Sequence, residues 1–261
     1  DCLGHLPWRG VLRGCYRGSK AQSAVLGGML TFHRTLGTYR NKVTRYIALN
    51  EFCRRKFIEG GLPAELIVLK PNFVDFEAPA SAERDGFLFV GRLSSEKGID
   101  AMVRAWAQVA SGSLRVAGTG PEAHLLDGQR NLTALGALAG DAVRTEMEKA
   151  LVLVLPSICY DSFPRTLVEA FACALPVIAS RLGPLAELVT DGVTGLLFEP
   201  GNSLDLADKM RWAQGHPEEM AEMGRTARKL YEAEFSAERN HQQLMAIYQD
   251  AINAVNDKAR Q

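Results

Sequence analysis

LVLVLPSICYDSFPRTLVEAFACALPVIAS, residues 151–180, decides the fold. An apolar run at 151–155 is followed by a polar loop, by a helical pattern that begins beside Pro164, and by a second apolar run at 176–179. Apolar strands of this length are typical of a parallel sheet that is buried on both faces. The loop and the helix also carry two carboxylates, Asp161 and Glu169, eight positions apart, so this stretch is the first candidate for chemistry.

The same alternation of strand and helix extends in both directions. Strand patterns cover 87–90, 113–117 and 131–135, and helical patterns cover 97–109, 121–128, 141–149, 165–173 and 184–190. Strands that alternate with helices indicate a parallel sheet with helices on both faces. After residue 201 the sequence predicts helices only, at 203–215, 217–232 and 236–255. The fold class is therefore α/β, with a Rossmann-like parallel sheet.

The part before residue 87 is less regular. Residues 1–20 carry glycines and a proline without a period and are interpreted as irregular, whereas helices are predicted over 21–36 and 51–59 and strands over 45–50 and 66–69. Residues 75–86 mix proline, alanine and charged residues without a period. They are predicted to be a linker between a domain at 1–74 and a domain at 87–261.

Composition bounds the class of protein. The 261 residues are 47% hydrophobic, and 30 basic residues balance 30 acidic ones, so the net charge gives no reason to expect nucleic acid as a partner. The five cysteines form no CxxC pair and are expected to be reduced thiols in a cytoplasmic protein, with peripheral membrane contact as an option. No metal site and no cofactor are predicted. A first residue other than Met leads us to expect a fragment or a processed chain.

Two cations follow the first strand of the regular region. Ligands of an open parallel sheet bind beyond the carboxyl ends of the strands, where helix N-termini offer unpaired N–H groups. Arg92 provides a planar fork and Lys97 a point charge, and together they suit a diphosphate without a metal ion. Spacing alone slightly favours two solvated surface cations, whereas the position directly after a buried strand favours a ligand site.

Glycine-containing turns follow two other strands. Gly118-Thr119-Gly120-Pro121 is a tight turn between strand and helix, but it lacks a full GxGxxG pattern, so a turn that merely needs a positive φ remains an alternative. Gly183-Pro184 precedes a further helix and forms a second candidate phosphate seat.

The two carboxylates fit the same ligand. Asp161, in a loop, could accept hydrogen bonds from sugar hydroxyls, and Glu169, on a helix, could hold a diol such as ribose. Taken singly, Asp161 is better explained as an acid favoured by the helix dipole, and Glu169 as an ordinary helix acid.

Five clusters in this order resemble one family. FVGRLSSEKGID (89–100), VAGTGPE (116–122), YDSFPRTLVEAFACALPVIAS (160–180), RLGPLAELV (181–189) and DGVTGLLFEPGN (191–202) are similar to the C-terminal half of retaining GT-B glycosyltransferases of the sucrose-synthase and mannosyltransferase type. The resemblance covers about residues 85–210. It implies two Rossmann-like domains that face a cleft, the C-terminal one binding the nucleotide-sugar. Residues 1–74 would then be an incomplete remnant of the second α/β domain, which binds the acceptor.

The resemblance also implies roles for individual residues. Arg92 and Lys97 match the basic pair that neutralises the leaving diphosphate, Asp161 stands where the family has a Glu that contacts the donor sugar, and these three form the implied catalytic set. Glu169 matches the acid that binds the ribose. Further implied substrate contacts are Gly91, Gly120, Leu135, Ser162, Phe163, Gly183, Pro184 and Leu185. Two departures are that Asp161 is one methylene shorter than Glu, and that Pro164 has no N–H to offer.

The function implied by this resemblance is transfer of a sugar, with retention of configuration, from a UDP-, GDP- or ADP-sugar to a glycan or lipid-linked saccharide, as in polysaccharide biosynthesis. A chain with an incomplete acceptor domain is expected to be inactive by itself. Alternatives are a nucleotide-binding module without transfer activity and a GT-B epimerase. A phosphorylase is less favoured because no lysine motif for pyridoxal phosphate is present.

Overall fold

The computed structural model describes residues 2, 5–76 and 83–260. They form two compact units. One contains the chain up to Pro71 together with the stretch from His241 onward, and the other is Asn72–Asn240. The sequence-based division had placed all of 87–261 in one domain, whereas the structure groups 241–261 with the first unit.

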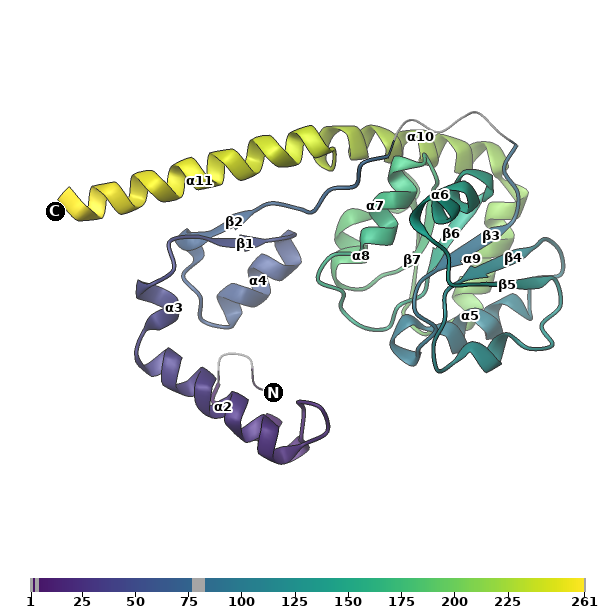
Figure 1. The fold of residues 1–261 in the computed structure, drawn as a ribbon. Helices are drawn as coiled ribbons and strands as arrows, with labels where there is room; N and C mark the ends of the chain where they lie inside the picture. Colours follow the sequence, from purple (N-terminus) through teal and green to yellow (C-terminus); the bar gives the residue numbers. More distant parts are fainter. Residues whose placement is uncertain (1, 3–4, 77–82, 261) are drawn as a thin grey trace. The chain divides into compact units, whose positions relative to one another are not determined.

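The second unit is built on six parallel strands (Figure 1). They lie in the order β5-β4-β3-β6-β7-β8. Their bounds are β3 Phe87–Val90, β4 Leu114–Ala117, β5 Leu132–Gly136, β6 Val152–Leu155, β7 Val177–Ser180 and β8 Gly195–Phe198. The helices of this unit are α5 Ile99–Trp106, α6 Gly140–Lys149, α7 Arg165–Ala172, α8 Gly183–Leu188, α9 Ser203–Gly215 and α10 Pro217–Glu234, and the 3-10 turns are η2 Ser95–Lys97 and η3 Ala123–Leu126.

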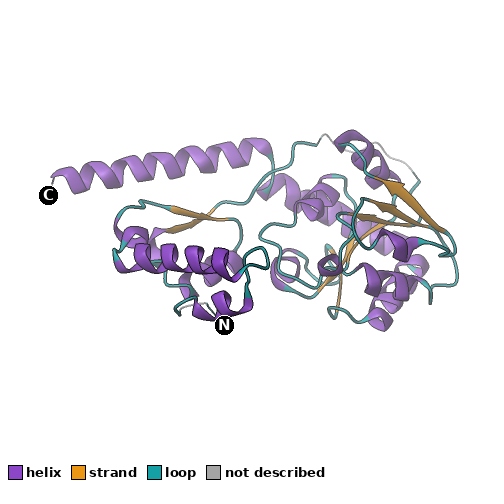
Figure 2. Ribbon diagram, turned by 60° about the horizontal axis from the view of Figure 1, so that its bottom comes forward, coloured by secondary structure: helices purple, strands orange, loops and turns teal. Residues whose placement is uncertain are grey.

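Successive strand residues enter two hydrophobic cores, one on each face of this sheet. Phe87 and Phe89 of β3 pack with α5 and α9, whereas Leu88 between them packs with α6 and α7. Figure 2 shows helices on both sides of the orange strands. The apolar runs in the sequence follow from this arrangement, because both sets of side chains are buried.

The strand order reverses between β3 and β6. From β3 the chain proceeds outward to β4 and β5, then returns to place β6 on the other side of β3. The connections after β3 and β6 therefore lead to opposite halves of the sheet, and such a switch point is where ligands bind in open α/β sheets.

The first unit contains a two-stranded parallel sheet, β1 Tyr46–Ala48 and β2 Ile67–Leu69. Its other elements are α1 Trp8–Arg13, α2 Lys20–Thr35, α3 Thr38–Asn41, α4 Glu51–Glu59 and the 3-10 turn η1 Ala64–Leu66. The Ser19 and Asn50 side chains cap α2 and α4 by accepting hydrogen bonds from the backbone N–H of Gln22 and Cys53.

The long helix α11, Ala237–Arg260, contributes to the first unit. The Arg45 guanidinium contacts the Asp250 carboxylate at 2.5 Å. Among the helices of the described ranges, none is both long enough and apolar enough to cross a bilayer.

Several sequence expectations are wrong in detail. The segment 1–20 contains the helix α1, which the glycines around it concealed. The region 121–128 forms only the short turn η3, because Pro121 and Gly128 leave too few residues for an α-helix. The predicted helix 97–109 begins at Ile99 after the turn η2, since Gly98 adopts a left-handed conformation (φ 72°). The strand β8 was not predicted at all.

Both described ends of the predicted linker, 75–86, pack on the second unit. The Phe76 N–H donates to the Tyr231 hydroxyl at 3.4 Å. The Arg84 guanidinium donates to the carbonyls of Met147, Ala150 and Cys173 at 3.1, 3.3 and 2.6 Å. Residues 77–82 of this linker lie outside the described residues.

Candidate functional site

A cavity of about 460 Å³ opens at the carboxyl ends of β3, β4 and β5. Three of the predicted site residues line it, namely Gly91, Arg92 and Gly120. Its walls are completed by Val90, Ala117, Gly118, Thr119, Pro121, Ala137, Leu138 and Val143. Small residues leave backbone groups accessible here, and Arg92 adds an exposed positive charge. A small polar ligand with negative charge suits such a lining.

Glycines let the loops of this cavity approach each other closely. A Cβ atom at Gly118, where φ is 144°, would lie 1.8 Å from the Gly91 carbonyl oxygen. One at Gly120 would lie 2.2 Å from the Leu93 carbonyl oxygen. Both distances are far below a normal contact, so glycine at these positions serves packing of backbone on backbone.

Lys97 and Asp161 meet at the switch point of the sheet. Lys97 closes the turn η2 after β3, and Asp161 lies in the loop after β6. The Lys97 ammonium donates to both carboxylate oxygens of Asp161, at 2.9 and 2.7 Å. The two side chains keep 28% and 29% of their surface exposed. The structure therefore joins two predicted site residues that are 64 positions apart in the sequence.

The two loops that carry this ion pair are fixed by backbone contacts. The Ile158 N–H donates to the Glu96 carbonyl at 3.0 Å. A Cβ atom at Gly98 would lie 2.0 Å from the Pro156 carbonyl oxygen, so only glycine permits this approach. Asp161 thus reaches Lys97 although its side chain is shorter than glutamate.

Glu169 lies on α7, where its side chain is 15% exposed. Burial raises the pKa of its carboxyl group, and the charge and hydrogen bond of Arg165 oppose this shift only in part. Arg165 Nε donates to Glu169 Oε1 at 2.9 Å. A partly desolvated carboxylate of this kind is a strong acceptor for ligand hydroxyls.

The start of α8 lies beside the Asp161 loop. A Cβ atom at Gly183 would lie 2.7 Å from Cδ1 of Tyr160, the residue before Asp161. Pro184 and Leu185 are buried and begin the helix. Of the predicted contacts in this turn, Gly183 is therefore the one beside the loop, and the side chain of Leu185 belongs to the core.

Three other predicted residues do not line the cavity. Phe163 packs against Phe235, with ring centroids 6.4 Å apart. Ser162 is exposed in the Asp161 loop. Leu135 lies within β5, and the cavity is lined instead by residues 137 and 138, which follow that strand. The rule that ligands lie beyond strand ends would have favoured these two residues over Leu135.

The cysteines show no sign of redox or metal chemistry in the described part of the chain. All five are free thiols. Burial raises the pKa of Cys173 to about 12, so that thiol is unreactive at neutral pH. No cluster of three or more histidine, cysteine, aspartate or glutamate side chains suitable for a metal ion occurs among the residues described.

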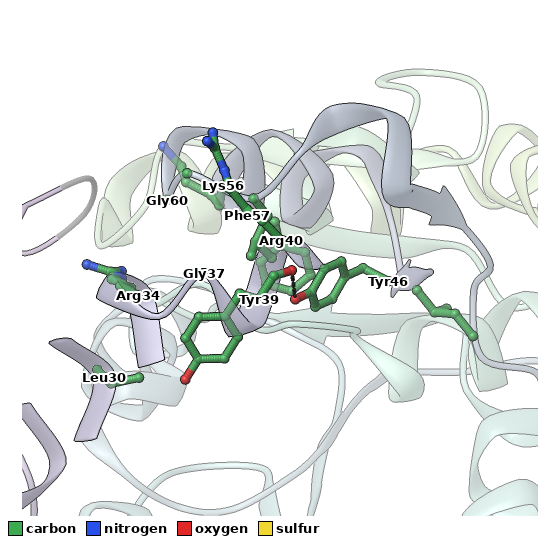
Figure 3. A pocket seen from close by; sticks show the side chains of 12 residues that line it. Leu30, Arg34, Gly37, Tyr39, Arg40, Tyr46, Lys56, Phe57 and Gly60 are labelled. Atoms are coloured by element: carbon green, nitrogen blue, oxygen red, sulfur yellow. Dashed lines mark hydrogen bonds between the residues drawn. The ribbon is translucent and has the colours of Figure 1, made fainter. Parts of the chain in front are cut away.

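A larger cavity, of about 780 Å³, lies in the first unit and contains none of the predicted site residues. Its walls are largely apolar, and Arg34, Arg40 and Lys56 contribute cations. Figure 3 shows Tyr39 and Tyr46 in its lining. The Tyr46 hydroxyl donates to the Tyr39 carbonyl at 2.7 Å. The glycine-containing turns after β3 and β4 and the Lys97–Asp161 ion pair lie in the second unit. The size of a cavity alone therefore does not identify the functional site.

Comparison with known proteins finds similarity over the second unit. The family model "Glycosyl transferases group 1" matches residues 84–214, which is half of the chain and includes all the loops described above. An uncharacterized glycosyltransferase of Methanocaldococcus jannaschii is 31% identical over 169 residues, covering 62% of this chain and 47% of the relative. A D-inositol 3-phosphate glycosyltransferase of an Arthrobacter species is 31% identical over 200 residues, covering 66% of this chain and 44% of the relative.

The fold is also that of a solved structure. Anabaena Alr3699/HepE, crystallised in complex with UDP, superposes with a TM-score of 0.74 at 23% identity, covering 79% of this chain and 64% of that one. The chain spans less than half the length of the two curated relatives named above.

Proposed function

Because the chain belongs to the glycosyl transferases group 1 family, we propose that its second unit binds the nucleotide-diphosphate sugar of a retaining glycosyltransferase. The observation that carries this proposal is the arrangement at the switch point. A cavity with accessible backbone groups and Arg92 lies at the ends of β3 to β5. Lys97 follows β3 and pairs with Asp161 in the loop after β6. Cations and backbone N–H groups are what a diphosphate requires.

In this proposal Arg92 and Lys97 stabilise the diphosphate as the bond to the anomeric carbon breaks. Negative charge develops on the leaving group, and fixed cations favour that charge more in the transition state than in the ground state. The residues present supply this stabilisation without a metal ion. Lys97 has three donors, so it can contact a phosphate oxygen while it still holds one oxygen of Asp161.

The carboxylates position the donor. Asp161 would accept hydrogen bonds from the sugar, and Glu169 from the ribose. The raised pKa of Glu169 supports this role, because a carboxylate that is poorly solvated by its surroundings gains when hydroxyl donors arrive. Gly183 beside the Asp161 loop, with backbone N–H groups at the start of α8, would contact the phosphates.

The first unit would belong to the acceptor domain. Its large cavity supports this assignment, since apolar walls with three cations suit a lipid-linked phosphate or a charged saccharide. A UDP complex is known for the Anabaena structure, which makes a UDP-sugar the first donor to test here, ahead of GDP- and ADP-sugars. A cytoplasmic protein in peripheral contact with a membrane fits these substrates.

Calorimetric titration of the chain with UDP, GDP and ADP tests the donor site. One of the three should bind and the other two should bind more weakly, because the phosphate contacts are shared and the base contacts are not. Absence of heat and of thermal stabilisation with all three would refute the proposal. If the protein is a nucleotide-binding module without transfer activity, the chain would bind a nucleoside diphosphate, but the full-length protein would neither hydrolyse nor transfer a donor sugar.

A further inference from the structure

The first residue of α7 is an arginine, Arg165, at a position where a cation does not stabilise a helix. The N-terminal end of a helix carries partial positive charge, so acidic side chains are favoured in its first turn and basic ones in its last. Arg165 pairs with Glu169 four residues later, and the more favourable order of such a pair has the acid first. The stability of α7 therefore gives little reason for an arginine here.

The contact between Arg165 and Glu169 joins two very different environments. The Arg165 side chain is 71% exposed, whereas that of Glu169 is 15% exposed. Arg165 Nε donates to Glu169 Oε1 at 2.9 Å, while Oε2 accepts no hydrogen bond from the described part of the chain. A solvated cation thus holds one oxygen of a largely buried carboxylate and leaves the other oxygen for a ligand.

The charged groups around Glu169 leave this task to Arg165. Burial raises the pKa of the Glu169 carboxyl, and the charge and hydrogen bond of Arg165 act in the opposite direction. The helix α10 packs on α7, but its Arg228 contacts Glu232 at 2.7 Å and a carbonyl at the end of α7. The Cys173 thiol, which also interacts with Glu169, stays protonated at neutral pH because its pKa is about 12.

We propose that Arg165 is a positioning residue that holds the Glu169 carboxylate in the orientation in which it accepts the two ribose hydroxyls of a nucleoside diphosphate. This inference rests on the proposed donor site. A glutamate side chain has three rotatable bonds, and a group that is already ordered in the free protein loses less entropy when its ligand binds. Each carboxylate oxygen accepts two hydrogen bonds, so Oε2 takes one hydroxyl and Oε1 takes the other while it still contacts Arg165.

The test compares ligands with and without the ribose hydroxyls on the whole chain. Calorimetry uses UDP, GDP and ADP and their 2′,3′-dideoxy forms. Arg165→Ala should weaken binding of the ribose form about 10-fold, as for one hydrogen bond to a charged group. The affinity for the dideoxy form should change by no more than about twofold. Arg165→Lys, which restores the charge, should recover most of the affinity, and the urea midpoint should be the same in all three proteins.

Two further variants separate positioning from a general effect of charge. Arg104→Ala removes an arginine that pairs with Asp100 at 2.6 Å, also four residues apart, on the exposed surface of α5. This control should leave the affinity for both forms of the nucleotide unchanged. In a Glu169→Gln background, Arg165→Ala should cause no further loss, because the group that it positions is already altered.

Different failures point to different steps of the reasoning. Equal weakening of both nucleotide forms by Arg165→Ala would indicate a direct contact with the diphosphate, and unchanged affinity would indicate an ordinary surface ion pair; either result overturns the proposal. Equal affinity of the unaltered chain for both forms would overturn it together with the ribose role of Glu169, but would leave the diphosphate site standing. If no nucleotide binds to the unaltered chain, the proposed donor site fails as well.

Discussion

Replacing Lys97 by alanine separates the proposed donor site from the stability of the fold. In the free protein the Lys97 ammonium donates at 2.9 and 2.7 Å to Asp161, and both side chains remain more than a quarter exposed. Ion pairs with this exposure contribute about 0–1 kcal/mol to the free energy of unfolding. We therefore expect Lys97→Ala to fold normally, with an unfolding free energy within about 1 kcal/mol of the original.

Ligand binding should respond much more strongly. A hydrogen bond between the ammonium and a phosphate oxygen is charge-assisted and contributes about 1.5–3 kcal/mol. Its loss corresponds to a roughly 10- to 150-fold weaker affinity for the nucleoside diphosphate. Isothermal calorimetry measures the affinity, and urea denaturation of the same samples measures stability.

A matched control is Lys149→Ala. Lys149 lies in the same unit, on α6, and pairs with Glu146 at 3.1 Å, but its side chain is on the surface away from the strand-end loops. This variant should match the original protein in both assays. Affinity in Lys97→Ala equal to that of the control would show that Lys97 does not contact the diphosphate, and the assignment of the site would fail.

Three further predictions concern neighbouring residues. Asp161→Asn should tighten binding of UDP without a sugar, because the carboxylate no longer competes for Lys97 or repels the phosphates; calorimetry that shows weaker binding would contradict this. Gly98→Ala should lower the free energy of unfolding, measured in urea, by about 2 kcal/mol or more, because the new Cβ would clash with the Pro156 carbonyl. The control Gly128→Ala has a similar φ of 71° but open space around the residue, so it should lose only about 1 kcal/mol. Glu169→Gln should raise the melting temperature at neutral pH. The folded-state pKa of the Glu169 carboxyl lies above its ordinary value of 4.5, so ionisation of this group destabilises the folded state at neutral pH. This penalty disappears as the pH falls toward 4.5. A difference in melting temperature that is independent of pH would exclude this cause.

The sheet of the second unit could be predicted from the sequence because parallel strands buried on both faces leave continuous apolar runs. The strands β3, β6 and β7 follow this pattern. The strand β4 and the partly exposed edge strand β5 are predicted from the alternation of strands with helices instead. The strand β8 is missed because its four residues, GLLF, lie between a glycine turn and Glu199-Pro200, and this context is typical of a loop. The helix α1 is missed because it has only six residues, none of them buried, and ends at Gly14 among other glycines.

The contacts of the site depend on information that local patterns do not contain. Spacing in the sequence places Lys97 and Asp161 each at the end of a strand, but only the order of the strands makes β3 and β6 neighbours. The same applies to Ala137 and Leu138, which become a wall of the cavity because β5 pairs with β4. The types of residue at the site were thus predictable, whereas their pairing required the topology.

Three glycines determine how closely the loops of the site approach one another. At Gly98, Gly118 and Gly120, a carbonyl oxygen of another loop lies 2.0, 1.8 and 2.2 Å from where a Cβ would stand. The loops of β3, β4 and β6 can therefore form one compact edge. This close approach also compensates for the short side chain of Asp161, because its loop is brought near enough to Lys97 for contact with both oxygens. A glutamate at this position would have to fold back or move the ammonium, so we infer that the loop geometry and the aspartate are matched to each other.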